Sequence, residues 1–330
     1  MKKVTSLLLI ILFAASCKNP KEDKSDTADV SNEPEKMDVM KLPDNYKLSL
    51  AQWALHVPIQ KNLMDPMDFA EYASKHGFEG IEYVDQLYKL DSTLAYKDAV
   101  MKLALSWKEK NDEFNVKPVL IMIDRAGELV DPSEEKRKEA VEKHSNWVDA
   151  AAAIGAPTLR VNLFGITTEK EWHDESVASL KALCEYAATK NISIAVENHA
   201  QLSNHAAKLA AVIKEVNMPN CGTLPDFGNF CVMREGGERW GPAPCIEEYD
   251  PYQGIAELMP YAIGVSAKAH TFDAAGNETE IDYYRMMQIV KDDNFSGYIG
   301  VEYEDEVSED PIAGINATRD LIIKAAAQAK

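Results

Sequence analysis

The sequence predicts one (β/α)8 barrel, an α/β fold of the TIM-barrel class, for most of the chain. Short apolar runs alternate with longer stretches of helical pattern, which is typical of a parallel sheet covered by helices. The eight apolar runs fall within about 285 residues, the usual size of such a barrel. A doubly wound open sheet would usually have fewer strands and often a glycine-rich phosphate turn, which we do not find.

The first seventeen residues indicate export. Lys2 and Lys3 form a positive start, and the apolar run at 7–15 is too short to span a bilayer. Small residues then lead to Cys17, so the segment resembles the signal of a bacterial lipoprotein in which Cys17 carries the lipid. We therefore expect an exported protein anchored to the cell envelope, on the periplasmic face or the cell surface, through this lipid alone.

The next stretch predicts a flexible tether over residues 18–45. Its first part, 18–41, is polar, charged and free of aromatic residues, so it cannot bury enough apolar surface to offset the entropy of ordering. The barrel is then expected over 46–330.

Strands and helices follow in regular order within the barrel. The predicted strands are 48–55, 80–84, 118–124, 157–164, 193–199, 221–227, 262–270 and 297–304. The predicted helices are 66–76, 131–155, 168–190, 203–217, 281–293 and 309–328. The second of these has Asp131 as its expected N-cap, Pro132 at the first helical position and Gly155 as its stop.

One segment interrupts this order, the stretch 228–254 after the sixth strand, which is rich in glycine, proline and aromatic residues. It is too long for a plain connector, and loops after barrel strands surround the active-site mouth. We expect an inserted loop that forms a lid or a wall of the substrate pocket, with an irregular surface insertion as the alternative. Its Trp240, like Trp53, could stack on a sugar ring or serve only in packing.

Charge and cysteine content exclude some classes of function. A net charge of -19 without a Lys/Arg cluster argues against nucleic acid as a partner. The cysteines after Cys17 match neither a zinc site nor a disulfide framework. In an oxidising exterior a pair among Cys221, Cys231 and Cys245 could form a disulfide, but we expect simple burial of these side chains and of Cys184.

The last four predicted strands end in Glu197, Asp226, His270 and Glu302. The carboxyl ends of barrel strands meet at one mouth, so these side chains are predicted to converge there. Three carboxylates and one imidazole suit one divalent metal ion, with Mn2+, Mg2+ or Co2+ favoured over Zn2+. Each of three residues, taken alone, could also have a purely structural role. Asp226 could cap a turn, Glu302 could belong to a solvated acidic run, and His270 could be a buried histidine whose nitrogens are hydrogen-bonded.

The strand series over residues 46–328 resembles the xylose isomerase-like superfamily, which includes sugar isomerases, D-tagatose 3-epimerase and its relatives, inosose dehydratase and endonuclease IV. The resemblance implies that these four residues hold the metal, and that Glu197 and Glu302 also move protons. The stretch "FSGYIGVEYE" resembles the family's Gly-x-x-x-x-Glu ending and selects Glu302 over Glu304. Two departures argue against a free ketohexose as substrate: "ENHAQLS" follows the fifth strand, and Asn229 replaces a usual histidine. The nuclease of the superfamily would need more histidines and a basic surface.

Five side chains are predicted to contact substrate at the same mouth. His199 shares a strand face with Glu197, and Lys268 shares one with His270. Lys268 could stabilise an enolate oxygen or form a structural ion pair. The full set is His199, Lys268, Asn229, Glu82 and Asn162.

These observations predict a metal-dependent isomerase or epimerase that acts through an enediolate on a small unphosphorylated sugar or keto-sugar. A 3-keto-glycoside lyase or dehydratase with the same metal site is the first alternative. A non-catalytic sugar-binding lipoprotein is the second. A homo-oligomer is compatible with all three.

Overall fold

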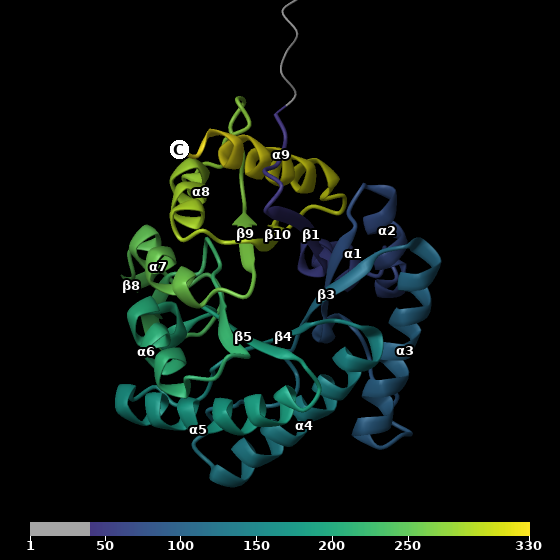
Figure 1. The fold of residues 1–330 in the computed structure, drawn as a ribbon, viewed down its shortest axis with the longest axis vertical. Helices are drawn as coiled ribbons and strands as arrows, with labels where there is room; N and C mark the ends of the chain where they lie inside the picture. The colour runs from purple at the N-terminus through teal and green to yellow at the C-terminus, as the bar shows by residue number, and fades with distance from the viewer. Residues whose placement is uncertain (1–39) are drawn as a thin grey trace, which may run out of the picture. The chain divides into compact units, whose positions relative to one another are not determined.

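The computed structural model describes residues 40–330 of the chain (Figure 1). The predicted signal with Cys17, and the tether from 18 to 39, lie outside the described residues. Residues 40–45 lead into the first strand, and Asn45 already contacts the barrel, since its Nδ2 donates to the Phe295 carbonyl at 2.9 Å.

Eight parallel strands form a nearly closed barrel, as the sequence predicts (Figure 1). Their order around the sheet is β6-β5-β4-β3-β2-β1-β10-β9. Backbone hydrogen bonds close the gap between the segments of β6 and β9, including Ser266 N to Pro225 O at 2.9 Å and Phe227 N to Ser266 O at 3.1 Å. The strands are β1 (Tyr46–Ala51), β2 (Gly80–Val84), β3 (Lys117–Met122), β4 (Thr158–Val161), β5 (Ser193–Glu197), β6 (Cys221–Leu224), β9 (Val265–Ala269) and β10 (Gly297–Tyr303).

Helices surround this sheet on its outer side (Figure 1). They are α1 (His56–Gln60), α2 (Phe69–Lys75), α3 (Tyr96–Phe114), α4 (Glu134–Ile154), α5 (Glu169–Ala188), α6 (Ala206–Val216), α7 (Pro251–Leu258), α8 (Tyr283–Asp292) and α9 (Ile312–Gln328). None of the helices within residues 40–330 is both long enough and apolar enough to cross a membrane.

The sequence prediction missed α1, α3 and α7. Helix α3 buries Val100, Ala104, Trp107 and Asn111, whose spacing is helical, but many charged residues between them obscure this pattern. Helix α4 begins at Glu134 after Ser133, so Asp131 is not its N-cap; Asp131 Oδ1 instead accepts from Ser133 N in the preceding turn at 2.8 Å. Gly155 ends α4 as predicted, with a φ of 80° that favours glycine.

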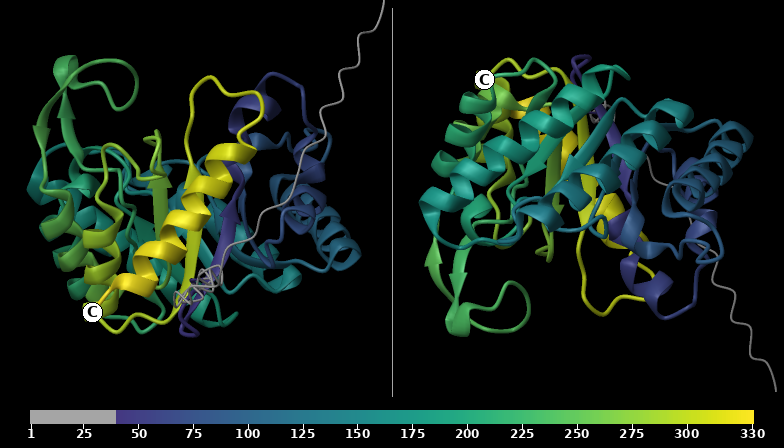
Figure 2. Two further views of the ribbon diagram at one scale, coloured as in Figure 1. Left: turned by 90° about the horizontal axis from the view of Figure 1, so that it is seen from above. Right: turned by 90° about the horizontal axis from the view of Figure 1, so that it is seen from below.

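The inserted loop at 228–254 contains an antiparallel hairpin of β7 (Cys231–Arg234) and β8 (Cys245–Glu248), followed by the start of α7. A disulfide joins Cys231 to Cys245. The expected burial of these two cysteines is therefore wrong: Cys245 is exposed and Cys231 is half-buried, and both are used as a covalent link. Figure 2 shows the hairpin projecting from the barrel at the same end as the segment between β10 and α9.

Candidate active site

Three predicted ligands converge at the carboxyl ends of β5, β6 and β10. One carboxylate oxygen from each of Glu197, Asp226 and Glu302 lies within 4.8 Å of the others. Glu197 ends β5, Asp226 follows β6 by two residues, and Glu302 lies in β10, so the parallel register brings them to one level. All three are buried, at 2%, 0% and 4% exposure, which means that their charge must be balanced inside the protein.

Two buried cations supply that balance. Lys268 Nζ lies 2.8 Å from Glu302 Oε1, 2.7 Å from Glu304 Oε2 and 3.9 Å from Asp226 Oδ2. On the other side, Arg160 Nε lies 2.9 Å from Glu197 Oε2, and its NH1 lies 2.6 Å from Asp124 Oδ1. Burial disfavours both cations, but the carboxylates around them raise the pKa of each above its usual range.

Sequence reasoning included Lys268 but missed Arg160. The sequence does point to Arg160, because it is a charged residue inside the apolar stretch "PTLRVNLF" and lies on the same face of the strand as Asn162. Such a residue points into the barrel with Asn162, where it needs an acidic partner.

Burial also raises the pKa of two of these acids. It raises the pKa of Glu197 well above its usual range, against the lowering effect of Arg160, and neighbouring Glu302 and Asp226 add to the rise. It raises the pKa of Asp226 to about 6, with Lys268 opposing the shift and Glu302 adding to it. Crowded buried carboxylates of this kind hold protons more readily than exposed ones, a feature common among acid-base and metal sites.

The structure does not bring His270 into the acidic group. The His270 Nδ1 atom lies 3.1 Å from the Glu304 carbonyl oxygen, and His270 is not part of the group whose carboxylate oxygens lie within 4.8 Å of one another. Ser266 takes that place, because its hydroxyl lies 2.8 Å from both Asp226 Oδ2 and Glu302 Oε2. Ser266, Lys268 and His270 share one face of β9, but Ser266 is the one level with Asp226, to which it is joined by a parallel bridge.

His199 and Asn162 lie together beside the acidic group. His199 Nδ1 is 3.0 Å from Asn162 Oδ1, while Asn162 Nδ2 donates to Asp124 Oδ1 at 2.7 Å. Since Asn162 Oδ1 is an acceptor in this arrangement, His199 Nδ1 carries the proton and Nε2 is free to accept one. Burial, followed by Arg160, lowers the pKa of His199 to about 3, so its imidazole is neutral.

Asn229 and Asn198 fix the turn that carries Asp226. Asn229 Nδ2 donates to Glu197 Oε1 at 3.3 Å. Asn198 Oδ1 accepts from Asp226 N at 2.8 Å, and its Nδ2 donates to the carbonyl oxygens of Asp226 and Asn229 at 3.0 and 2.9 Å. Asn198 is thus a positioning residue to which the sequence prediction gave no role.

Glu82 lies buried in β2, close enough to Glu302 and Arg160 for their charges to act on its carboxylate. Its Oε1 accepts from Ser49 at 2.6 Å, and it is 2% exposed. Its carboxylate fills the space beside Gly300, where an added Cβ would lie 2.6 Å from Glu82 Oε1. Burial raises its pKa to about 7.

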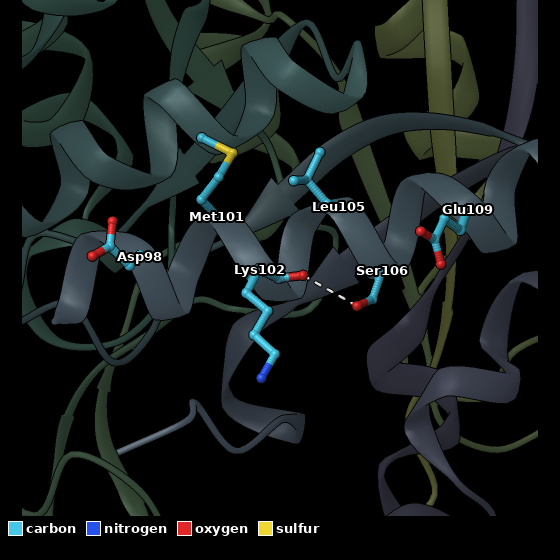
Figure 3. Close-up of a pocket in the computed structure, with 6 residues that line it drawn as sticks. All are labelled: Asp98, Met101, Lys102, Leu105, Ser106 and Glu109. Carbon is cyan, nitrogen blue, oxygen red and sulfur yellow. Dashed lines mark hydrogen bonds between the residues drawn. The ribbon is translucent and has the colours of Figure 1, made fainter. Parts of the chain in front are cut away.

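A different concave feature lies outside the barrel, along α3 (Figure 3). It is a surface groove on the outer side of the helix, lined by Asp98, Met101, Lys102, Leu105, Ser106 and Glu109. None of the predicted site residues lines it, so we assign it no part in the chemistry at the mouth.

Comparisons with known proteins agree with this architecture. The model of one family, described as the xylose isomerase-like TIM barrel, matches residues 70–325. No curated protein matches the chain by sequence.

Several solved structures are similar to the chain. A structure of the IolI protein with a zinc atom has a TM-score of 0.61 and 15% identity, covering 86% of this chain and 99% of that one. L-ribulose 3-epimerase has a TM-score of 0.61 and 15% identity, covering 85% and 94%. The 3-keto-D-glucoside 4-epimerase YcjR of E. coli has a TM-score of 0.57 and 17% identity, covering 84% and 98%. At this level of identity the likeness shows the fold.

Proposed function

Because this chain belongs to the xylose isomerase-like TIM barrel family, we propose that it is a divalent-metal-dependent isomerase or epimerase of an unphosphorylated sugar or keto-sugar. The observation that carries the proposal is the convergence of Glu197, Asp226 and Glu302 at the mouth. The epimerases among the similar structures support the reaction type.

The donor atoms fit a metal ion. The Ser266 hydroxyl oxygen lies 2.8 Å from an oxygen of Asp226 and from an oxygen of Glu302, but its single proton can be donated to only one of them. The other carboxylate must then be protonated, or a cation must bind beside it. Glu197 Oε2 accepts no hydrogen bond, although Arg160 Nε lies nearby. Oxygen donors of this kind favour Mg2+ or Mn2+, with Co2+ next, over Zn2+, even though the similar IolI structure holds zinc.

The bound ion would polarise a carbonyl and an adjacent hydroxyl oxygen and so acidify the hydrogen on the carbon between them. Glu197 and Glu302 would serve as the acid-base pair, one taking the proton from that carbon and the other returning a proton to it. Burial and the neighbouring carboxylates raise the pKa of Glu197, which makes its carboxylate a stronger proton acceptor than an exposed one. Asn229 holds Glu197 Oε1 in place.

A lyase is the second candidate, favoured by two groups that a simple epimerase does not require. His199 offers a neutral Nε2 at the mouth, and the Lys268 ammonium lies between Glu302 and Glu304. The Lys268 ammonium could donate to a departing glycosidic oxygen, and His199 Nε2 could accept the proton that is removed beside a 3-keto group. Both reactions begin with the same proton transfer.

The proposed location is outside the cytoplasm, with Cys17 as lipid anchor. The Cys231–Cys245 disulfide supports it, since disulfides persist mainly in oxidising compartments. Sugar phosphates are mainly cytoplasmic, so this location supports an unphosphorylated carbohydrate as the partner. We propose no nucleic acid partner and no membrane contact apart from the lipid.

The test is proton NMR in D2O with metal-free protein to which Mg2+, Mn2+ or Co2+ is added. Free sugars, keto-sugars and 3-keto-glycosides are the substrates, and Glu302→Gln is the matched variant. We expect deuterium to enter the carbon beside the carbonyl, and exchange to be absent with Glu302→Gln.

Release of a free aglycone or a second sugar would move the assignment to the lyase. Metal binding without exchange on any of these compounds would contradict both enzymatic proposals and favour a sugar-binding lipoprotein.

A further inference from the structure

The tip of the β7–β8 hairpin places a tryptophan against a residue of the candidate site. The ring centroids of Trp240 and His199 are 4.5 Å apart, and Phe164 lies 5.8 Å from Trp240 in an edge-on arrangement. His199 in turn contacts Asn162, which leads to Asp124 and Arg160 beside Glu197. The indole is therefore connected to the polar network of the mouth through a single residue, His199.

The tip is attached to the barrel by more than this one contact. Arg239 NH2 forms an ion pair with Glu128 Oε1 at 2.8 Å, and the Arg239 guanidinium lies 4.4 Å from the centre of the Phe164 ring. Glu128 follows β3, Phe164 follows β4 and His199 follows β5. The hairpin tip thus touches three consecutive loops at the carboxyl end of the barrel.

The hairpin is also braced within itself. The Cys231–Cys245 disulfide joins its two strands, Glu235 N donates to Pro244 O at 2.9 Å, and Arg234 NH1 donates to Ala243 O at 3.0 Å. A covalent link of this kind reduces the number of conformations open to the loop between the cysteines. The position of Trp240 is therefore held on both sides, by the disulfide and by the barrel loops.

Trp240 keeps 46% of its surface exposed in this position. One part of the indole packs on His199 and Phe164, and the remaining part faces solvent. If packing were its whole role, burial of the full ring would stabilise the hairpin further. A rigid, half-exposed indole beside polar groups is instead the arrangement that aromatic residues adopt in ligand sites.

We propose that Trp240 is the platform of a second sugar subsite, which binds the non-reacting pyranose ring of a glycoside or disaccharide whose other ring reaches Glu197, Asp226 and Glu302. The apolar C–H face of that pyranose stacks on the exposed part of the indole. This inference rests on the proposed function, because it takes the ligand to be a sugar. It adds that the natural substrate has more than one ring.

The test is isothermal titration of the metal-loaded protein with cellobiose, maltose and lactose, with glucose as the one-ring reference. We expect at least one disaccharide to bind about tenfold more tightly than glucose, and Trp240→Ala to remove this difference. Trp240→Phe, which keeps an aromatic face, should retain most of it.

Ile246→Ala is the matched control, since Ile246 is 61% exposed on β8 of the same hairpin and should leave every affinity unchanged. Reduction of the disulfide should weaken disaccharide binding without changing that of glucose. The proposal is overturned if no disaccharide binds more tightly than glucose, or if Trp240→Ala keeps the preference.

Failure of this inference can be told apart from failure of the proposed function. Deuterium exchange on a keto-sugar without a disaccharide preference would leave the enzyme and remove the second subsite. A preference that depends on Trp240, without exchange on any keto-sugar, would keep the subsite in a protein that only binds sugar.

Discussion

The buried carboxylate of Asp85 and the group formed by Glu197, Asp226 and Glu302 have different surroundings. Asp85, after β2, accepts from Asp124 N at 2.8 Å with one oxygen and from Arg125 N at 3.2 Å with the other. Glu197, Asp226 and Glu302 instead crowd together and share Ser266, Lys268 and Arg160. Burial raises the pKa of Asp85 to about 7, so a shifted acid alone does not mark an active site. Backbone donors that satisfy both oxygens indicate a structural acid, and convergence on a common point indicates a ligand.

Asp226→Asn should have the largest effect, because it removes one charged ligand and leaves the other role of the side chain intact. Its Oδ1 accepts from Gly228 N and Asn229 N at 2.9 Å, which an asparagine oxygen can also do. We expect Mn2+ affinity, measured by calorimetry, to fall about 100-fold and deuterium exchange about 1000-fold. Thermal unfolding of the metal-free variant should match that of the wild type. Unchanged Mn2+ affinity would remove Asp226 from the metal site.

Asp85→Ala should show the opposite pattern. The two backbone N–H groups lose their acceptors, so we expect the free energy of unfolding, measured with urea, to fall by about 3 kcal/mol. Under conditions where the variant is folded, Mn2+ affinity and the exchange rate should stay within about threefold of wild type. A large loss of deuterium exchange without a loss of stability would show that Asp85 takes part in the reaction. It would then no longer differ from the acids of the metal site.

His144 extends the comparison to a buried group of another type, an imidazole inside a helix. Its Nδ1 contacts the Ala140 carbonyl at 2.7 Å inside α4, and burial lowers its pKa from 6.5 to about 4. Below pH 6.5 the unfolded chain binds a proton that the folded protein does not, so stability falls as the pH falls from 7 towards 4.

Between pH 7 and pH 5 this protonation difference lowers the stability of the wild type by about 2 kcal/mol. His144→Gln removes the difference, so urea unfolding at the two pH values should show a fall in stability that is smaller by this amount. The exchange rate at pH 7 should not change. Equal pH slopes for the two proteins would show that His144 is protonated in the folded state.

The sequence by itself determined the strand order and most of the acidic group. The alternation of apolar runs with helical patterns predicts a parallel barrel, and Glu197, Asp226 and Glu302 come together because parallel strands present their carboxyl ends at one mouth. The helix α3 was missed because charged residues mask its buried stripe, and not because the stripe is absent.

Tertiary structure decided which residue of β9 meets that group. Strand parity places Ser266, Lys268 and His270 on the same face, but it does not say how far along the barrel each one lies. The bridge between Asp226 and Ser266 sets that level, and His270 lies four residues, about 13 Å of strand, beyond it. Register between strands distant in sequence depends on the packing of the whole barrel.

The same holds for Arg160, whose carboxylate partners come from β5 and the end of β3, and for the hairpin. The sequence indicates an inserted loop with two cysteines and a tryptophan. Only the folded chain joins Cys231 to Cys245 and sets Trp240 on His199, because both contacts depend on where the loop returns to the barrel.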